Sequence, residues 1–345
     1  MPTIVPIYID ADAAGGGNGS LSTPYNSLDT ALSTEVSTPN QLTSAALTTN
    51  DELAKFIILA SSGGVLTESV ATGISSSWTT DATRYIWIVA DTAHYASANW
   101  SASKVIVDFT NAAGFGNIFR DFLLEGLQLR FPSAGSQTGV SVRSGGSSYR
   151  EFKNCYWWCS GTGGSSDYGI IWGSTLGAEI SNNIFRGWDS AILNARAGGA
   201  AIPIYNNTFI SNTNAVNFTS TTQALCKNNL FSGSTTDTVG ADSTNSDYNA
   251  TSNASLGYTS NTNDRTSQTF TFEAGADNFE LASTDAGAKD FGANLTSDPT
   301  YPITTDITNT ARTGTWDIGA DEYFAGGGGI SIPVAMHHFN QMRNQ

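Results

Sequence analysis

A short phrase built around asparagine recurs through the middle of the chain and constrains the fold more than any other feature. It reads EFKNCYWW at 151–158, EISNNIFRGW at 179–188, PIYNNTFISN at 203–212 and ALCKNNLFSG at 224–233. The leading asparagines follow one another after 28, 24 and 22 residues, and are Asn154, Asn182, Asn206 and Asn228. A repeat of this length with strand-like alternation in every unit indicates a solenoid.

An earlier phrase, FLLEGLQLRF at 122–131, fits the same pattern with Gly126 in the place of the asparagine. Each unit holds only short strands and turns, so its backbone is satisfied by stacking on the next unit. Asparagine tolerates the left-handed backbone of a tight turn and can bond to an asparagine above and below it. We therefore predict an all-β parallel β-helix with an Asn ladder at one corner. A β-sandwich or a propeller with Asn-rich turns is the alternative.

The N-terminal region predicts a cap for the open end of such a solenoid. The run GGGNGS at 15–20 lacks the Lys-Ser or Lys-Thr of a phosphate-binding loop. Apolar residues at helical spacing follow Ser22, Thr23 and Pro24, which are helix start signals, and they are Tyr25, Leu28, Ala31 and Leu32. We expect residues 1–50 to form a strand and a capping helix. Calcium at Asp10, Asp12 and Asn18 is a weaker alternative, because no bidentate Glu closes the set.

Beyond the cap, we expect residues 51–325 to form about ten coils with a closing segment, at roughly 25 residues a coil. The stretch 232–268 is poor in large apolar residues and predicts long loops beside the late coils. We expect residues 326–345 to form a Gly linker and a C-terminal tail.

Two phrases near the C-terminus carry a family resemblance. They are DNFELASTDAGAKDFGA at 277–293 and DITNTARTGTWDIGADEY at 306–323. The repeat resembles that of right-handed β-helix proteins of the pectate-lyase-like superfamily, and the two phrases resemble the closing segment of such proteins. In that segment a last strand reads Asp-Ile-Gly-Ala-x-Glu, here residues 317–322. The resemblance implies a right-handed single-stranded parallel β-helix with an N-terminal helical cap, and it leaves the activity open because one fold hosts many functions.

The composition of the chain excludes several classes of binding partner. Charged residues are 13% of the chain, and 15 basic against 30 acidic residues give a formal net charge of −15. We therefore expect no nucleic acid and no anionic lipid as partner. No apolar run approaches the roughly 20 residues of a membrane span, and no basic region with an apolar stretch opens the chain, so we expect neither membrane insertion nor export by the general secretory route. The cysteines Cys155, Cys159 and Cys226 are interpreted as buried free thiols rather than a zinc site.

Catalytic chemistry has weak support. The chain has no adjacent Asp pair, and its histidines are His94, His337 and His338. The residues that come nearest to a lyase site are spread over two coils, and they are Asp167, Glu179, Arg186, Asp189 and Arg196. No repeated acidic position gathers them, so we interpret them as solvated turn charges with an Arg–Asp pair. We predict no catalytic residue, no cofactor and no metal.

Aromatic residues are concentrated between 149 and 188, and exposed rings hold sugars by stacking. Alternation along strands sends about half of them into the core, and core filling is the main interpretation. The candidate carbohydrate-binding residues are Tyr156, Trp157, Trp158, Tyr168, Trp172 and Trp188.

The tail after the Gly linker is apolar and follows a finished fold, so we expect it to bind a partner. Its apolar residues are Ile330, Ile332, Val334, Met336, Phe339 and Met342. This tail resembles C-terminal peptides of phage β-helix proteins, which implies a non-enzymatic virion surface protein: a spike, fibre or capsid decoration assembled in the host cytoplasm. Such proteins are expected to be homotrimers that contact other virion proteins through the tail and glycans on the host surface. A polysaccharide-degrading lyase or hydrolase and a bacterial surface adhesin are the alternatives.

Overall fold

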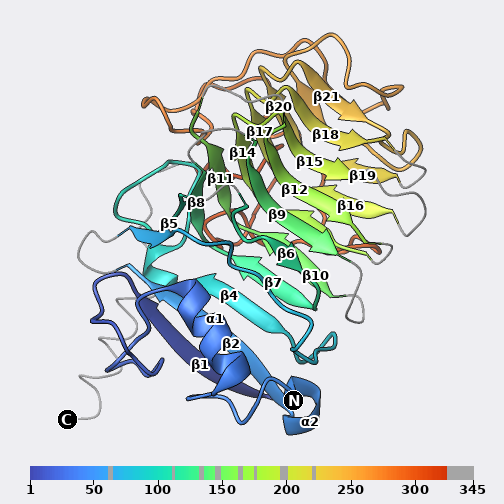
Figure 1. Cartoon of the computed structure of the whole chain (residues 1–345). Helices are drawn as coiled ribbons and strands as arrows, with labels where there is room; N and C mark the ends of the chain where they lie inside the picture. The colour runs from blue at the N-terminus through green and yellow to red at the C-terminus, as the bar shows by residue number, and fades with distance from the viewer. Residues whose placement is uncertain are drawn as a thin grey trace, which may run out of the picture.

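The computed structural model describes residues 1–60, 65–110, 113–131, 136–143, 149–161, 166–174, 177–194, 201–219 and 223–324. Within these ranges the chain passes through three sheets in turn, and every strand pairs in parallel with its equivalent one coil away (Figure 1). The chain is a parallel β-helix, which confirms the fold predicted from the repeat.

The strands of each sheet stack in chain order. Sheet 1 contains β1 (Thr3–Asp10), β2 (Glu52–Leu59), β4 (Ile86–Ala90), β7 (Phe122–Glu125), β10 (Arg150–Lys153), β13 (Glu179–Ser181), β16 (Ile202–Tyr205) and β19 (Ala224–Lys227). Sheet 2 contains β3 (Leu66–Glu68), β5 (Ile106–Phe109), β8 (Gln128–Phe131), β11 (Tyr156–Cys159), β14 (Ile184–Arg186), β17 (Thr208–Ile210), β20 (Leu230–Ser232) and β22 (Ala250–Thr251). Sheet 3 contains β6 (Asn117–Ile118), β9 (Thr138–Arg143), β12 (Tyr168–Gly173), β15 (Ser190–Asn194), β18 (Asn214–Phe218) and β21 (Thr236–Val239).

The number of coils differs from the prediction. The described ranges give sheets of eight, eight and six strands rather than about ten coils. Part of the stretch expected as loops, 232–268, forms the late strands β21 and β22 instead. The chain still stacks on the last coil at Arg265, which bridges in parallel to Ala250, and it then turns back along the outside of the solenoid. The remaining residues counted toward further coils are therefore used elsewhere.

A helix covers the N-terminal end of the interior. Helix α1 (Leu28–Ser37) packs Leu28 and Leu32 into the same core as Ile7 on β1. The helix begins later than predicted, because Ser27 is the cap that accepts from Thr30 N at 3.2 Å. Tyr25 lies before the helix, where it bridges to β1. The short α2 (Leu47–Asn50) and the 3₁₀ turn η1 (Thr92–His94) complete the helical elements of the described chain.

The leading asparagines lie at the corner between sheets 1 and 2. Asn154, Asn182, Asn206 and Asn228 all have φ between 53° and 57°, the left-handed conformation that Asn tolerates. Gly126 occupies this corner one coil earlier with φ 74°. A Cβ there would lie 2.7 Å from the ring of Tyr95, so glycine is required by a neighbouring side chain as well as by the turn.

The buried hydrogen-bonded ladder is formed by the residue after the leading asparagine in the last three phrases and by Asn249 one coil later, which sequence reasoning did not single out. Its members, all fully buried, are Asn183, Asn207, Asn229 and Asn249. The side-chain oxygen of Asn207 accepts from Asn183 N at 2.9 Å, and Asn229 does the same for Asn207 N at 3.0 Å. Among the leading asparagines, Asn182 Nδ2 donates to Asn154 Oδ1 at 3.1 Å. The ladder therefore runs inside the corner, and the leading residues mainly shape the turn.

Aromatic rings fill the interior behind sheet 2. The rings of Phe185, Phe209 and Phe231 stack with successive centroid separations of 5.3 and 5.0 Å and interplanar angles of 10° and 7°. Trp157 continues the column at 5.7 Å from Phe185. One buried ring per coil, in register with the parallel strands, holds successive coils at a constant offset.

The C-terminal segment, residues 266–324, packs against the outside of the corner between sheets 1 and 2, and we call it the strap. Phe279 N donates to Ala98 O at 2.8 Å, and Gly319 N donates to Asn228 O at 2.8 Å. The strap therefore spans several coils, and in Figure 1 its red part lies behind the sheets. The sequence predicted a final strand at 317–322. The structure instead gives a compact turn in which Arg312 donates to Glu322 at 2.9 Å and to Gly319 O at 2.7 Å.

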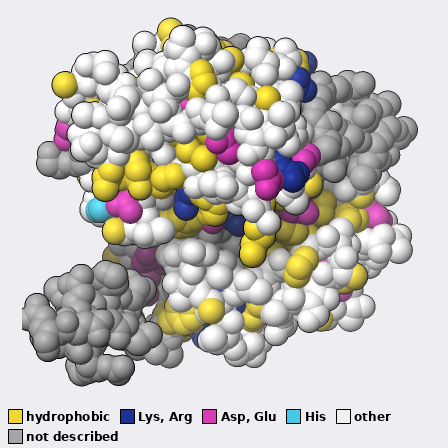
Figure 2. Space-filling model, turned by 90° about the horizontal axis from the view of Figure 1, so that it is seen from below, with side chains coloured by type: hydrophobic (Ala, Val, Ile, Leu, Met, Phe, Trp, Pro, Cys, Tyr) yellow, Lys and Arg dark blue, Asp and Glu magenta, His cyan; other side chains and the backbone are white. Residues whose placement is uncertain are grey.

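The surface is dominated by uncharged groups. Most of the face in Figure 2 is white, the colour of backbone and uncharged polar side chains, with scattered acidic and basic side chains. This agrees with the low charged fraction of the sequence. No helix within the described ranges is long and apolar enough to cross a membrane.

Candidate functional site

Three of the predicted carbohydrate-binding residues are core residues. Trp157, Trp172 and Trp188 are at most 1% exposed. Trp188 Nε1 donates to Trp157 O at 3.1 Å, so its polar atom is also used internally. Burial excludes sugar stacking on these rings, because the alternation of the strands turns them inward.

The outward-facing rings of β11 are covered or occupied by other parts of the chain. Tyr156 is fully buried beneath the strap, 6.2 Å from the ring of Phe279. Trp158 is partly exposed and carries the guanidinium of Arg186 at 4.9 Å from its ring. Tyr168, on sheet 3, is partly exposed as well. The predicted stripe is therefore not a continuous exposed surface, since the chain's own C-terminal segment packs over part of it.

The residues considered for a lyase site are not brought together. Asp167 is buried before β12, where Oδ1 accepts from Gln137 N at 2.8 Å. Arg186 lies on sheet 2 and forms an ion pair with Asp277 of the strap. Asp189 precedes β15, and Glu179 lies on sheet 1. Arg196, His337, His338 and the tail residues 330–345 lie outside the described residues.

A different set of side chains meets on the outer face of sheet 1. Glu151 on β10 and Glu179 on β13 are direct partners in the register of neighbouring strands. Neighbouring strands lie about 4.8 Å apart, so the two carboxyl groups leave the same face side by side. Lys153 Nζ lies 3.5 Å from Glu151 Oε1 and 3.6 Å from Glu125 Oε1. This row of three glutamates and one lysine is the candidate site.

Two phenols from different parts of the chain hold Glu151. Tyr149 OH donates to Glu151 Oε2 at 2.6 Å, and Tyr301 OH of the strap donates to Oε1. Burial, and then the charge of Glu151, raise the pKa of Tyr149 and that of Tyr301 far above their ordinary value. Both phenols therefore remain donors at any physiological pH, and Glu151 is held in a fixed orientation.

Glu179 has a different environment. Burial, and then the charge of Glu151, raise the pKa of Glu179 to about 7, while Lys153 opposes the shift. At neutral pH a substantial fraction of Glu179 is therefore protonated next to the hydrogen-bonded Glu151. Two adjacent carboxyl groups in unequal environments are the arrangement from which acid and base roles arise.

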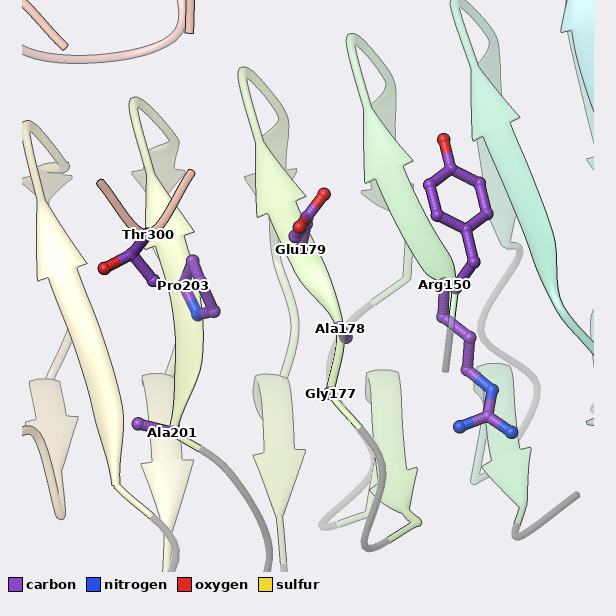
Figure 3. Close-up of a pocket in the computed structure, with 8 residues that line it drawn as sticks. Arg150, Gly177, Ala178, Glu179, Ala201, Pro203 and Thr300 are labelled. Atoms are coloured by element: carbon purple, nitrogen blue, oxygen red, sulfur yellow. The ribbon is translucent and has the colours of Figure 1, made fainter. Parts of the chain in front are cut away.

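A shallow groove of about 200 Å³ adjoins Glu179. Figure 3 shows its lining: Glu179 projects on the same side of the sheet as Pro203, and Thr300 of the strap lies over the neighbouring strand. The guanidinium of Arg150 points away from Glu179 in this view and donates to Ser174 Oγ at 2.9 Å. The groove therefore offers a carboxyl group and a hydroxyl, with the arginine turned away.

A signal for this row was present in the sequence. Glu151 and Glu179 both stand three residues before the leading asparagine of their phrase. The expectation that no repeated acidic position exists was therefore wrong for these two coils. The other lyase candidates near Glu179 in sequence lie on or beside other sheets, so position in the repeat, rather than nearness in sequence, identifies its partner Glu151.

The comparisons with known proteins add little to this site. Neither the known family models nor the curated proteins include a match to the chain. Among solved structures, pectate lyase Pel9A is similar at 14% identity, with 94% of this chain and 97% of that chain covered and a TM-score of 0.32. A score this low carries no argument about the site.

Proposed function

We propose that the chain is a non-enzymatic surface protein of a phage particle, such as a spike, fibre or capsid decoration. The observation that supports this role is that groups on its outer faces are already engaged by the strap. Tyr301 donates to Glu151, Asp277 pairs with Arg186, and Tyr156 is buried beneath Phe279. A solenoid whose coils are joined by the strap is suited to resist unfolding under mechanical force.

Attachment and self-association are assigned to the tail, residues 330–345. Burying five or six of its apolar side chains in a partner contributes on the order of 8 kcal/mol before the cost of ordering the tail. Several copies acting together, as in a trimer, multiply this contribution. The contribution of a single tail is modest against the cost of association, and we propose that several copies acting together make it sufficient for attachment.

The test is truncation after Ala325, with a full-length chain whose residues 330–345 are shuffled as the matched control. The truncated chain should keep its circular dichroism spectrum but lose trimers in analytical ultracentrifugation and lose incorporation into particles. The shuffled chain keeps the apolar content and should fail in the same way if the docking is specific. Normal assembly of the truncated chain contradicts the proposal.

A second candidate function is supported by the Glu151–Glu179 pair. In hydrolysis of a polysaccharide, Glu179 would donate its proton to the leaving oxygen while the Glu151 carboxylate bonds to the anomeric carbon and displaces that oxygen. The Glu179 carboxylate would then take a proton from a water whose oxygen bonds to the anomeric carbon, which releases the sugar and restores both groups. Burial lowers the pKa of Lys153, but the charges of Glu151 and Glu125 outweigh it and raise that pKa overall, which makes Lys153 a poor base for a lyase. Hydrolysis is therefore the better-supported reaction.

This alternative is tested by incubating the protein with neutral and uronate polysaccharides and measuring new reducing ends. Glu179→Gln removes the acid and should abolish any cleavage, whereas Asp290→Asn on the exposed surface is the control and should leave it unchanged. Cleavage that is lost in Glu179→Gln overturns the non-enzymatic proposal. Cleavage that persists in that variant excludes this site as its origin.

A further inference from the structure

Tyr248 is an exception at the corner between sheets 1 and 2, where the earlier coils have Asn or Gly. Lys227 bridges to Asp247 and the inner ladder continues from Asn229 to Asn249, so Tyr248 takes the place that Asn228 holds one coil earlier. Its φ is 59°. A bulky residue in the left-handed region carries a conformational cost that Asn avoids at the same corner. Such an exception points to a role for the side chain itself.

Tyr248 is half-buried and lines a groove of about 450 Å³ beside the last coils. The lining is rich in amides and hydroxyls, which come from Thr244, Asn245, Asn261, Thr262 and Asn263. Thr244, Asn245, Thr262 and Asn263 are exposed. The groove therefore combines one aromatic ring with several accessible hydrogen-bonding groups.

Internal hydrogen bonds hold the walls in place. Asp247 Oδ2 accepts from Asn263 Nδ2 at 2.8 Å, and Oδ1 accepts from Tyr248 N at 2.9 Å. Asn245 Nδ2 donates to Asp242 Oδ2 at 2.7 Å. These bonds orient the side chains before a ligand arrives, which reduces the ordering cost of binding.

The charges favour a neutral ligand. Lys227 Nζ lies 2.6 Å from Asp298 Oδ2, so its charge is paired within the chain. Asp247 adds a carboxylate to the wall, and the chain as a whole carries a formal charge of −15. An anionic polymer is therefore repelled, whereas hydroxyl groups can bond to the amides and the carboxylate.

We propose that this groove is a binding site for a neutral saccharide, in which the Tyr248 ring stacks on a sugar face and the surrounding amides and hydroxyls bond to sugar hydroxyls. The site is separate from residues 149–188, where a carbohydrate surface was expected. It does not depend on the proposed attachment role or on the Glu151–Glu179 pair.

The experiment is isothermal titration calorimetry of the full chain with neutral hexasaccharides of glucose, mannose, galactose and N-acetylglucosamine, and with hexagalacturonate as the anionic control. We expect at least one neutral hexasaccharide to bind and hexagalacturonate to bind more weakly. Tyr248→Asn restores the corner residue and should weaken that binding by about tenfold or more, while Tyr248→Phe keeps the ring and most of the affinity.

A stability measurement separates binding from folding. Tyr248→Asn should unfold at a higher urea concentration than the natural chain, because it removes the conformational cost at the corner. Loss of affinity together with a gain in stability supports the site. Absence of binding by all four neutral sugars, equal affinity in Tyr248→Asn, or a less stable Tyr248→Asn overturns the proposal.

Discussion

Replacing Asn207 by alanine should destabilise the chain far more than replacing its neighbour Asn206. The Asn207 side chain donates to Ile180 O at 2.9 Å and Tyr205 O at 3.0 Å, and accepts from Asn183 N at 2.9 Å. All of these bonds lie in the buried interior. Alanine would remove them and leave the Asn183 amide without its acceptor.

The magnitude follows from these bonds. A buried donor left unpaired costs about 1–3 kcal/mol, and each net hydrogen bond contributes about 1 kcal/mol. One orphaned donor and the lost side-chain bonds together give about 4 kcal/mol. At Asn206 the side-chain polar atoms have no hydrogen-bond partner, and glycine suits φ 53°. Asn206→Gly should therefore change the free energy of unfolding by about 1 kcal/mol or less.

Urea unfolding of the two variants, followed by circular dichroism and tryptophan fluorescence, compares them directly. The midpoint of Asn207→Ala should fall well below that of the natural chain, while Asn206→Gly stays close to it. Equal midpoints for the two variants would show that the inner ladder does not hold the coils together.

Three further predictions concern stability and reactivity. Burial raises the pKa of Asp237 from an ordinary 3.8 to about 6. Its contribution to stability, about 3 kcal/mol, is therefore present below about pH 4 and is lost as the pH rises through 6. Asp237→Asn should flatten this part of a pH series of urea midpoints, and an unchanged slope would contradict the assignment. Gly126→Asn should lower the melting temperature because of the Tyr95 ring, although Asn is the usual corner residue, whereas Asn206→Gly should have little effect. Burial raises the pKa of Cys155 to about 12, so its thiol should resist a disulfide reagent until urea unfolds the chain, and rapid labelling of the native protein would refute this.

The solenoid could be predicted because its local requirements are strict. A left-handed corner selects Asn or Gly, and this choice recurs once per coil, as Asn154, Asn182 and Gly126 show. The inner ladder escaped notice because Asn183 and Asn207 follow the corner residue directly, and their inward direction depends on the turn geometry. A doubled asparagine in three successive phrases was the available signal.

The candidate site was harder to predict, for a physical reason. Glu151 becomes a fixed carboxylate only when Tyr301 of the strap arrives from 150 residues away in sequence. The strap carries no repeat, so nothing local indicates which coil it contacts. The aromatic residues posed a similar problem, because alternation alone cannot tell that outward-facing Tyr156 is covered by Phe279.

The strap also determines how the solenoid unfolds. A solenoid whose coils touch only their neighbours can fray from either end, one coil at a time. Here Phe279 is tied to Ala98 and Gly319 to Asn228, so the intervening coils cannot separate until these ties are released. The strap can dock only on coils that already exist, which makes its closure a late event in folding and its release an early barrier in unfolding. The central coils should therefore unfold cooperatively and at a low rate. The lifetime of the folded state is then governed by an activation barrier rather than by equilibrium stability alone.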